Sequence, residues 1–252
     1  MGTPQGGILS PLLANIALHV LDEHLHAPWE PGGNMRNTGR RHRRRAKGLP
    51  NWRLVRFADD LVVLVHGTRA DTLALQDRIA GVLATLGLRL SPSKTQVVHA
   101  RDGFNFLGFH IRWQRKHGTS KWYWYNLVGK DSIRSVRTKI RRLTRRTSQQ
   151  DLRAVLEQIN PILRGWTNYF RHVVAQRVFD VLRQFVWWRI VRMMRHRHRW
   201  NWGAVRRWLT DRNGRWRPIQ ADGTVLFDPA AVPIIRYRYR GDTIPSPWAT
   251  AA

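Results

Sequence analysis

The chain has 252 residues, and 42% of them are hydrophobic, so it can bury a core and is not disordered throughout. Lys and Arg number 44 against 16 acidic residues, a formal net charge of +28, and Cys is absent. The lack of Cys excludes disulfides, zinc ribbons and Cys-based zinc endonucleases. The charge predicts a polyanionic partner, because a compact protein this cationic would repel itself.

The partner predicted from this charge is nucleic acid, with an anionic membrane surface as the alternative. The 13 Trp are interleaved with Arg instead of lying on one amphipathic helix, which favours nucleic acid. No apolar run approaches the roughly 18 residues of a membrane span, and Met1–Gly7 has no signal-peptide pattern. We therefore expect a reducing, cytoplasmic (bacterial-type) location and no membrane contact.

The N-terminal part of the chain predicts a helix followed by a cationic loop. Apolar residues recur at helical spacing from Ile8 to His26, which predicts a helix there. Pro28 to Pro50 is rich in Gly, Pro and Arg and is expected to be a loop, either mobile and solvated or in contact with phosphate. The phosphate contacts predicted in it are Arg40, Arg41, Arg43, Arg44 and Arg45.

Two short β-rich runs, Arg53–Phe57 and Leu61–Val65, predict a hairpin with Asp59 and Asp60 at its turn. Adjacent carboxylates repel each other, and Mg²⁺, which prefers oxygen ligands, would offset that repulsion. From composition alone, an exposed turn with two solvated Asp side chains is favoured over a metal site, because two Asp residues at a turn are common.

The rest of the chain changes from mixed structure to helices. Helix is predicted at Ala70–Leu86, ended by Gly87, and again over most of Asp131–Leu209. Between residues 130 and 210 there are 20 Lys and Arg against 4 acids, which is more than half of the net charge. Strands are predicted at Val97–Val98, Phe104–Ile111, Trp122–Tyr125 and, in the tail rich in Gly and Pro, Ile234–Tyr239.

Several of these segments resemble sequence motifs of one enzyme family. Phe57-Ala58-Asp59-Asp60 resembles the YADD motif of reverse transcriptases, with Phe in place of Tyr, and residues 2–16 resemble the PQG motif of the group II intron enzymes. Residues 86–95 and Phe106-Leu107-Gly108-Phe109 resemble the two palm blocks that follow. Because all four stand in family order, the chain resembles a group II intron reverse transcriptase and maturase.

This resemblance implies roles for individual residues. Asp59 and Asp60 would hold Mg²⁺ for two-metal phosphoryl transfer, and Leu107 and Gly108 would grip the primer. The pocket for template and incoming nucleotide would be formed by Pro4, Gln5, Gly6, Phe57, Ala58 and Lys94.

Residues 159–170 resemble the maturase domain, domain X, which occupies the thumb position in this family. Apolar residues of 162–174 and 178–188 are expected to form buried faces of two helices, so that most aromatics there belong to the core. The predicted RNA contacts are Arg164, Arg189, Arg192 and Arg195, with exposed Arg and Trp at 195–202 as candidates for stacking. A metal site at His196 and His198 is disfavoured, because neither Cys nor a carboxylate lies near them.

The fold class expected is α+β, with a partial polymerase palm (an antiparallel sheet with helices) at residues 1–120. A helical thumb or maturase domain X follows at 121–210 and a basic tail at 211–252. The function implied is that of an RNA-directed DNA polymerase and intron maturase, using Mg²⁺ and binding structured intron RNA, RNA template and DNA primer.

The fingers and the family's upstream catalytic Asp motif do not appear in this sequence. The chain alone is therefore expected to be an incomplete, nearly inactive form, with an upstream reverse transcriptase fragment as a further candidate partner. The alternative function is a non-catalytic RNA-binding splicing factor. A retron-type reverse transcriptase is disfavoured by the pattern at 160–170.

Overall fold

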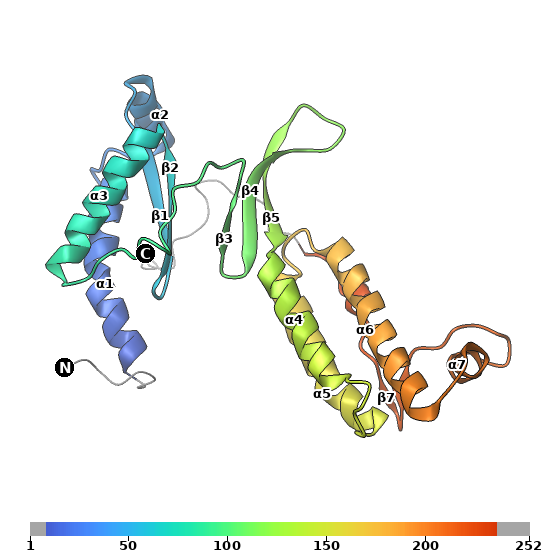
Figure 1. The fold of residues 1–252 in the computed structure, drawn as a ribbon. Helices are drawn as coiled ribbons and strands as arrows, with labels where there is room; N and C mark the ends of the chain where they lie inside the picture. The colour runs from blue at the N-terminus through green and yellow to red at the C-terminus, as the bar shows by residue number, and fades with distance from the viewer. Residues whose placement is uncertain (1–8, 236–252) are drawn as a thin grey trace, which may run out of the picture. The chain divides into compact units, whose positions relative to one another are not determined.

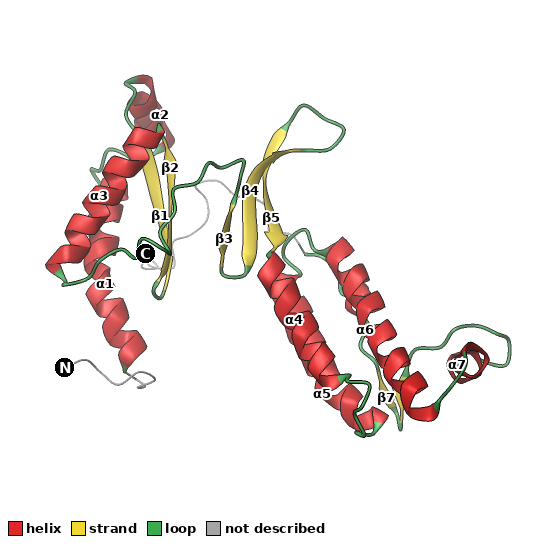
Figure 2. Cartoon of the chain, in the orientation of Figure 1, coloured by secondary structure: helices red, strands yellow, loops and turns green. Residues whose placement is uncertain are grey.

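The computed structural model describes residues 9–235 and contains two compact units, residues 1–102 and 103–252 (Figure 1). Both units combine helices with small antiparallel sheets (Figure 2), which confirms the predicted α+β class. The finer division at residues 120 and 210 stays a prediction. Within residues 9–235, no helix is both long and apolar enough to span a bilayer.

The first unit is a β-hairpin with one face on two helices. Alternate residues of the first strand, Trp52 and Leu54, are buried against Leu21 and Leu25 of the first helix and against the third helix. The elements are α1 (Ser10–His26), a 3₁₀ turn (Ala27–Trp29), α2 (Thr38–Ala46), β1 (Asn51–Phe57), β2 (Asp60–His66) and α3 (Arg69–Thr85).

Both long helices predicted in this unit are confirmed, to within two residues at each end. Thr68 begins α3 with a capping box, in which its hydroxyl accepts from the Asp71 N–H and the Asp71 carboxylate accepts from the Thr68 N–H. Gly87 follows the helix in the left-handed region (φ 70°), where glycine carries no steric cost. Local signals therefore determined both ends of this helix.

The predicted loop at residues 28–50 is wrong for residues 38–46, which form α2. Asn37 caps this helix by accepting a hydrogen bond from the Arg40 N–H at 2.9 Å. Arg40 and Arg41 then donate to carbonyls of the preceding turn, at Gly32 (2.6 Å) and Met35 (3.0 Å). An arginine-rich run can thus form a helix when its guanidinium groups bind the neighbouring carbonyls.

The second unit joins a three-stranded sheet to a helical bundle. The sheet has the order β3 (Phe104–Phe106), β4 (Phe109–Arg115) and β5 (Trp122–Val128). The bundle contains α4 (Lys130–Leu143), α5 (Leu152–Phe170), α6 (Gln176–His198) and α7 (Trp202–Leu209) (Figure 1). Its core includes Ile140, Leu156, Leu163, Ile190 and Val205, each with no exposed side chain surface.

The tail predicted at 211–252 packs on this bundle as far as it is described, to residue 235. It contains β6 (Gln220–Ala221), β7 (Thr224–Val225) and a 3₁₀ turn (Pro229–Ala231). Ile219 is 1% exposed in the bundle core. Of the strand predicted at 234–239, Ile234 and Ile235 are not in a strand, and residues 236–239 lie outside the described residues.

Three other predictions of strands and helices need correction. Val97–Val98 is not a strand, and the strand predicted at 104–111 is broken by a turn at Leu107 and Gly108. The two predicted apolar helix faces are only partly right, because α5 ends at Phe170 and Val181 is 43% exposed. The strand predicted at Trp122–Tyr125 is confirmed as part of β5, and the helices predicted between residues 131 and 209 are confirmed as α4 to α7.

Candidate active site and nucleic-acid interface

The two candidate metal ligands lie at the tip of the β1–β2 hairpin. Phe57 pairs with Asp60, which leaves Ala58 and Asp59 as a two-residue turn. Ala58 has φ 52°, a left-handed conformation that costs a non-glycine residue about 1 kcal/mol. Both carboxylates are exposed. The hairpin predicted around them is therefore confirmed, while their role as ligands remains a prediction.

Arg56 holds this turn against α1. Its guanidinium donates to both carboxylate oxygens of Asp22, to Asn15 Oδ1 at 2.8 Å and to the Ala58 carbonyl at 2.8 Å. The side chains of Arg56 and Asp22 are only 13% and 18% exposed. The hydrogen bond to Asp22 raises the pKa of Arg56. One cation thus joins the strained turn to α1, the helix that contains the second half of the N-terminal motif.

The face of the hairpin that carries Asp60 is open to solvent. Residues paired across the strands share a face, so Asp60 lies on the same side as Phe57, Val55 and Val62. Phe57 is 64% exposed and Val55 44% exposed. The opposite face packs against α1 and α3, so Asp60 lies on the exposed face of the hairpin.

The remaining predicted pocket residues do not form a described site. Pro4, Gln5 and Gly6 lie outside the described residues. Lys94 is exposed in a turn after α3, where its N–H donates to the Ser91 carbonyl at 3.1 Å. The nucleotide pocket therefore stays a prediction.

The predicted primer grip, Leu107 and Gly108, is the tight turn between β3 and β4. Both residues have positive φ, 48° and 79°. A Cβ on Gly108 would lie 2.8 Å from the Ser132 hydroxyl oxygen, so only glycine fits this position. The two carbonyls of the turn accept hydrogen bonds from the helical bundle, Leu107 from the Tyr169 hydroxyl at 2.8 Å and Gly108 from the Ser132 hydroxyl at 2.9 Å.

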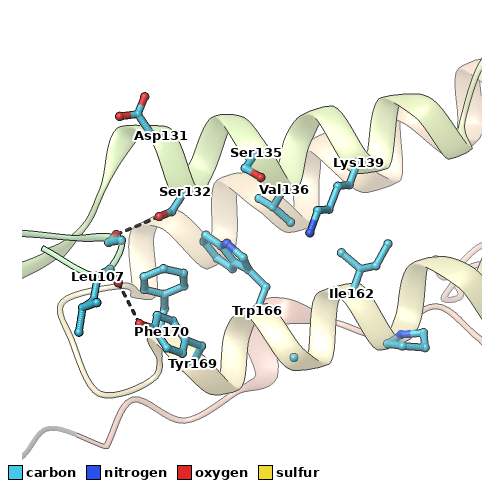
Figure 3. A pocket seen from close by; sticks show the side chains of 13 residues that line it. Leu107, Asp131, Ser132, Ser135, Val136, Lys139, Ile162, Trp166, Tyr169 and Phe170 are labelled. Atoms are coloured by element: carbon cyan, nitrogen blue, oxygen red, sulfur yellow. Dashed lines mark hydrogen bonds between the residues drawn. The ribbon is translucent and has the colours of Figure 1, made fainter. Parts of the chain in front are cut away.

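A cavity of about 600 Å³ opens beside this turn, between α4 and α5 (Figure 3). The Lys139 ammonium points toward it from α4, and Trp166 and Ile162 line it from α5 (Figure 3). Gly165 also lines it, and a Cβ there would meet nothing within 4 Å. The turn and the bundle thus form one concave surface with a cation on its wall.

The cationic run on α2 divides into inward and outward arginines. Arg44 donates to the Pro50 carbonyl at 2.7 Å and, like Arg40 and Arg41, is only partly exposed. Arg43 and Arg45 are exposed. Three of the five predicted phosphate contacts therefore hold the local fold, and two present their charge to solvent.

The predicted cations of the bundle also differ in their surroundings. Arg189 donates to the Thr144 hydroxyl at 3.0 Å and to the Thr144 carbonyl, so it closes the end of α4. Burial, and then the charges of neighbouring arginines, lower its pKa. Arg164 is exposed with its guanidinium 5.5 Å from the Phe227 ring, and Arg192 is exposed near Trp188. Arg195 is half-buried against Trp202.

The sequence interpretation did not include Arg56, Asp22, Asn15, Ser132 and Tyr169 among the site residues. Ser132 and Tyr169 bind the primer-grip turn from 24 and 62 residues away in the sequence, and Arg56 binds α1 residues that lie 34 and 41 residues earlier. Contacts over such separations leave no local pattern in the sequence. The available signal was a cation directly before the Phe-Ala-Asp-Asp motif.

Comparison with known proteins identifies both halves of the chain. Residues 1–111 match the family described as reverse transcriptase (RNA-dependent DNA polymerase), and residues 133–216 match the family described as group II intron, maturase-specific domain. Residues 1–111 thus belong to the reverse transcriptase family and residues 133–216 to the group II intron maturase-specific family, and the chain is similar to group II intron-encoded proteins. The twin-Asp hairpin lies in the reverse transcriptase segment, and helices α5 and α6 lie in the maturase-specific segment.

Similar proteins include the group II intron-encoded protein LtrA of Lactococcus lactis, which is 30% identical over 48% of this chain. Protein YkfC of Escherichia coli is 38% identical over 46% of the chain. An uncharacterized 91 kDa protein in a cob intron of Schizosaccharomyces pombe is 27% identical over 69% of it. The chain spans 27%, 34% and 28% of the lengths of these relatives, respectively.

Proposed function

We propose that this chain acts as part of an RNA-directed DNA polymerase and intron maturase. It would hold Mg²⁺ at Asp59 and Asp60 and bind structured intron RNA together with an RNA template and DNA primer. The observation that carries the proposal is the exposed twin-Asp hairpin within a reverse transcriptase segment that a maturase-specific segment follows.

The donor chemistry of the hairpin tip suits Mg²⁺. Proteins usually bind this ion through one or two carboxylates, leaving its other positions to water and substrate phosphates. Bound there, Mg²⁺ would stabilise the charge on the transferring phosphoryl group. The chain's own residues would position the carboxylates, because Arg56 fixes the turn, and the open face would admit the substrate.

We propose that a third carboxylate for this site comes from outside residues 9–235. Within those residues, no group of three or more His, Cys, Asp or Glu side chains is arranged to hold a metal ion. The two-metal mechanism needs a carboxylate to bridge the ions, so polymerisation would require that further ligand. A separate reverse transcriptase fragment is the candidate source.

The surface beside the primer-grip turn supports contact with nucleic acid. Lys139 supplies a cation, Gly165 leaves open space, and the turn carbonyls of Leu107 and Gly108 are fixed by the bundle. A rigid concave surface with a cation on its wall suits a nucleic acid backbone. We propose that the primer end lies along this cavity.

The second candidate function is a non-catalytic RNA-binding splicing factor. The observation that favours it is the distribution of charge, because residues 130–210 carry 20 Lys and Arg against 4 acids. A chain that binds RNA only through this half would not depend on Asp59 or Asp60.

Primer extension separates these two functions. The full chain would be incubated with Mg²⁺ and a DNA primer on a structured RNA, alone and with a fragment carrying the fingers and upstream Asp motif. We expect RNA binding in both cases, with steep salt dependence, and extension only with the fragment. Asp59→Asn should abolish extension, and Asp77→Asn, an exposed acid on α3, should not.

Three results would contradict different parts of these proposals. RNA binding with no extension under any of these conditions would favour the splicing factor. Extension that persists in Asp59→Asn would place the metal site elsewhere. RNA binding that is insensitive to salt would contradict both functions, because both depend on phosphate contacts.

A further inference from the structure

A second, strongly cationic cavity lies at the far end of the helical bundle from the sheet. Its volume is about 990 Å³, and three segments line it: the loop between α4 and α5, the last turns of α6, and the residues directly after α6. Among the described residues that line it there is no acid. They are Arg146, Thr147, Gln149, Arg192, Arg195, His196, Arg197, Arg199 and Trp200.

Two of these arginines hold the walls of the cavity together. Arg197 donates to the Ser148 carbonyl at 2.8 Å, which joins α6 to the α4–α5 loop. Arg195 donates to the Trp200 carbonyl at 3.3 Å, which fixes the turn after α6. Because these contacts use carbonyls and not carboxylates, they leave the positive charge of both arginines uncompensated.

The three other arginines that line the cavity add to this positive charge. Arg146, Arg192 and Arg199 are exposed. Burial lowers the pKa of nearby Arg189, and the charges of Arg141, Arg146 and Arg192 lower it further. The positive potential of the cavity therefore also acts on Arg189. A fixed cationic concavity of this kind suits phosphate, which arginine binds through two parallel hydrogen bonds.

Two exposed indoles adjoin the same cavity. The Arg195 guanidinium lies 4.5 Å from the Trp202 ring centroid, and the Arg192 guanidinium lies 5.8 Å from that of Trp188. The two rings meet edge to face, with centroids 5.5 Å apart. Trp188 is 43% exposed and Trp202 46% exposed. Large exposed aromatic groups beside cations are typical of surfaces on which bases stack.

We propose that this cavity and the two indoles form one binding site for an unpaired nucleotide of RNA. Its phosphates would lie among the arginines and its base would stack on Trp202, which Trp188 supports by their edge-to-face contact. This inference rests on the proposed RNA-binding function and narrows it to bulged or looped RNA. A base inside an A-form stem is stacked within the helix and cannot reach a surface indole, whereas an unpaired base can turn outward.

The combination of groups favours RNA over an acidic protein as the occupant. An acidic peptide could neutralise the arginines, but it offers no flat ring to the indoles. A nucleotide offers both a phosphate and a base. Arg195 connects the two parts of the proposed site, because it lines the cavity and its guanidinium lies against Trp202.

Two labelled RNA hairpins of equal length test the proposal, one fully paired in its stem and one with a bulged nucleotide. Fluorescence anisotropy with the full chain should show tighter binding of the bulged RNA, by about 5- to 100-fold, the effect of one stacked base. Trp202→Leu should remove this preference and leave the paired RNA unaffected. Trp124→Leu, with 49% exposure on β5, is the matched control.

The arginine part of the site has a different readout. Arg192→Gln should weaken the binding of both RNAs and reduce the magnitude of the slope of log affinity against log salt concentration by about 1. Trp202→Phe should keep most of the preference, because a smaller ring still stacks. This variant separates loss of stacking from loss of folding.

The outcomes distinguish failure of this inference from failure of the proposed function. The nucleotide site alone would be overturned if the wild-type chain bound both RNAs with equal affinity. It would also be overturned if Trp202→Leu and Trp124→Leu reduced the preference for the bulged RNA equally. Competition by polyglutamate as effective as that by the bulged RNA would assign the cavity to an acidic protein. Binding of neither RNA would contradict the RNA-binding function itself.

Discussion

Replacing Asn160 by Ala should destabilise the helical bundle by about 2–3 kcal/mol. The Asn160 side chain lies in α5 and is 7% exposed. Its Nδ2 donates to the Val225 carbonyl at 2.8 Å, and its Oδ1 accepts from the Phe227 N–H at 2.8 Å. Truncation leaves two backbone groups without a partner, and each costs about 1–3 kcal/mol when buried. The low end applies because the contacts are only partly buried.

Thermal unfolding followed by tryptophan fluorescence would measure this loss. Eleven of the 13 Trp lie in residues 103–252, so the signal reports mainly on the unit that contains Asn160. A loss of 2–3 kcal/mol corresponds to a fall in Tm of about 4–12 °C for a unit of this size. Asn160→Asp keeps the acceptor for Phe227 but places a buried carboxylate oxygen against the Val225 carbonyl, so it should cost at least as much as Asn160→Ala.

The matched control is Asn168→Ala, which removes an exposed Asn from the same helix. It accounts for the gain in helix propensity that Ala brings at either position. If the two Ala variants differ in stability by less than about 0.5 kcal/mol, Asn160 does not anchor the C-terminal segment, and the reasoning is refuted.

Three further predictions concern the first unit. Arg56→Gln should cost about 2–3 kcal/mol in unfolding free energy, because it leaves the Asp22 carboxylate without its cation, and a smaller loss by urea denaturation would contradict this. Gly81→Ala should stabilise α3 by about 0.5–1 kcal/mol, since a Cβ there meets nothing within 4 Å, and calorimetry showing destabilisation would refute it. Hydrogen bonds from the backbone and hydroxyl of Thr68 lower the pKa of Asp71, so this carboxylate stabilises the fold above its unfolded pKa of about 3.9 and loses that effect as the pH falls through its folded value. The stability difference between wild type and Asp71→Asn, measured from pH 7 to pH 3, should therefore shrink below about pH 4.

The sequence by itself determined the local structure and the order of the motifs. The ends of α3 follow from Thr68 and Gly87, and the twin-Asp hairpin follows from two β-rich runs around a short turn. Caps, turns and hydrophobic periodicity act over a few residues, so they can be recognised in a linear sequence. The wrong prediction for α2 also has a local cause, because the composition of residues 28–50, rich in Gly, Pro and Arg, is typical of loops.

Only the tertiary structure decided which polar side chains serve the fold and which remain available to a ligand. Arg189 was predicted to contact RNA, yet it binds Thr144, 45 residues away, while Arg192 on the same helix is exposed. Asn160 finds its partners 65 and 67 residues later in the chain. A guanidinium or an amide has the same donors wherever it stands, so its role depends on the carbonyls that packing brings to it. That pairing is set by the burial of distant apolar surfaces, which no short stretch of sequence contains.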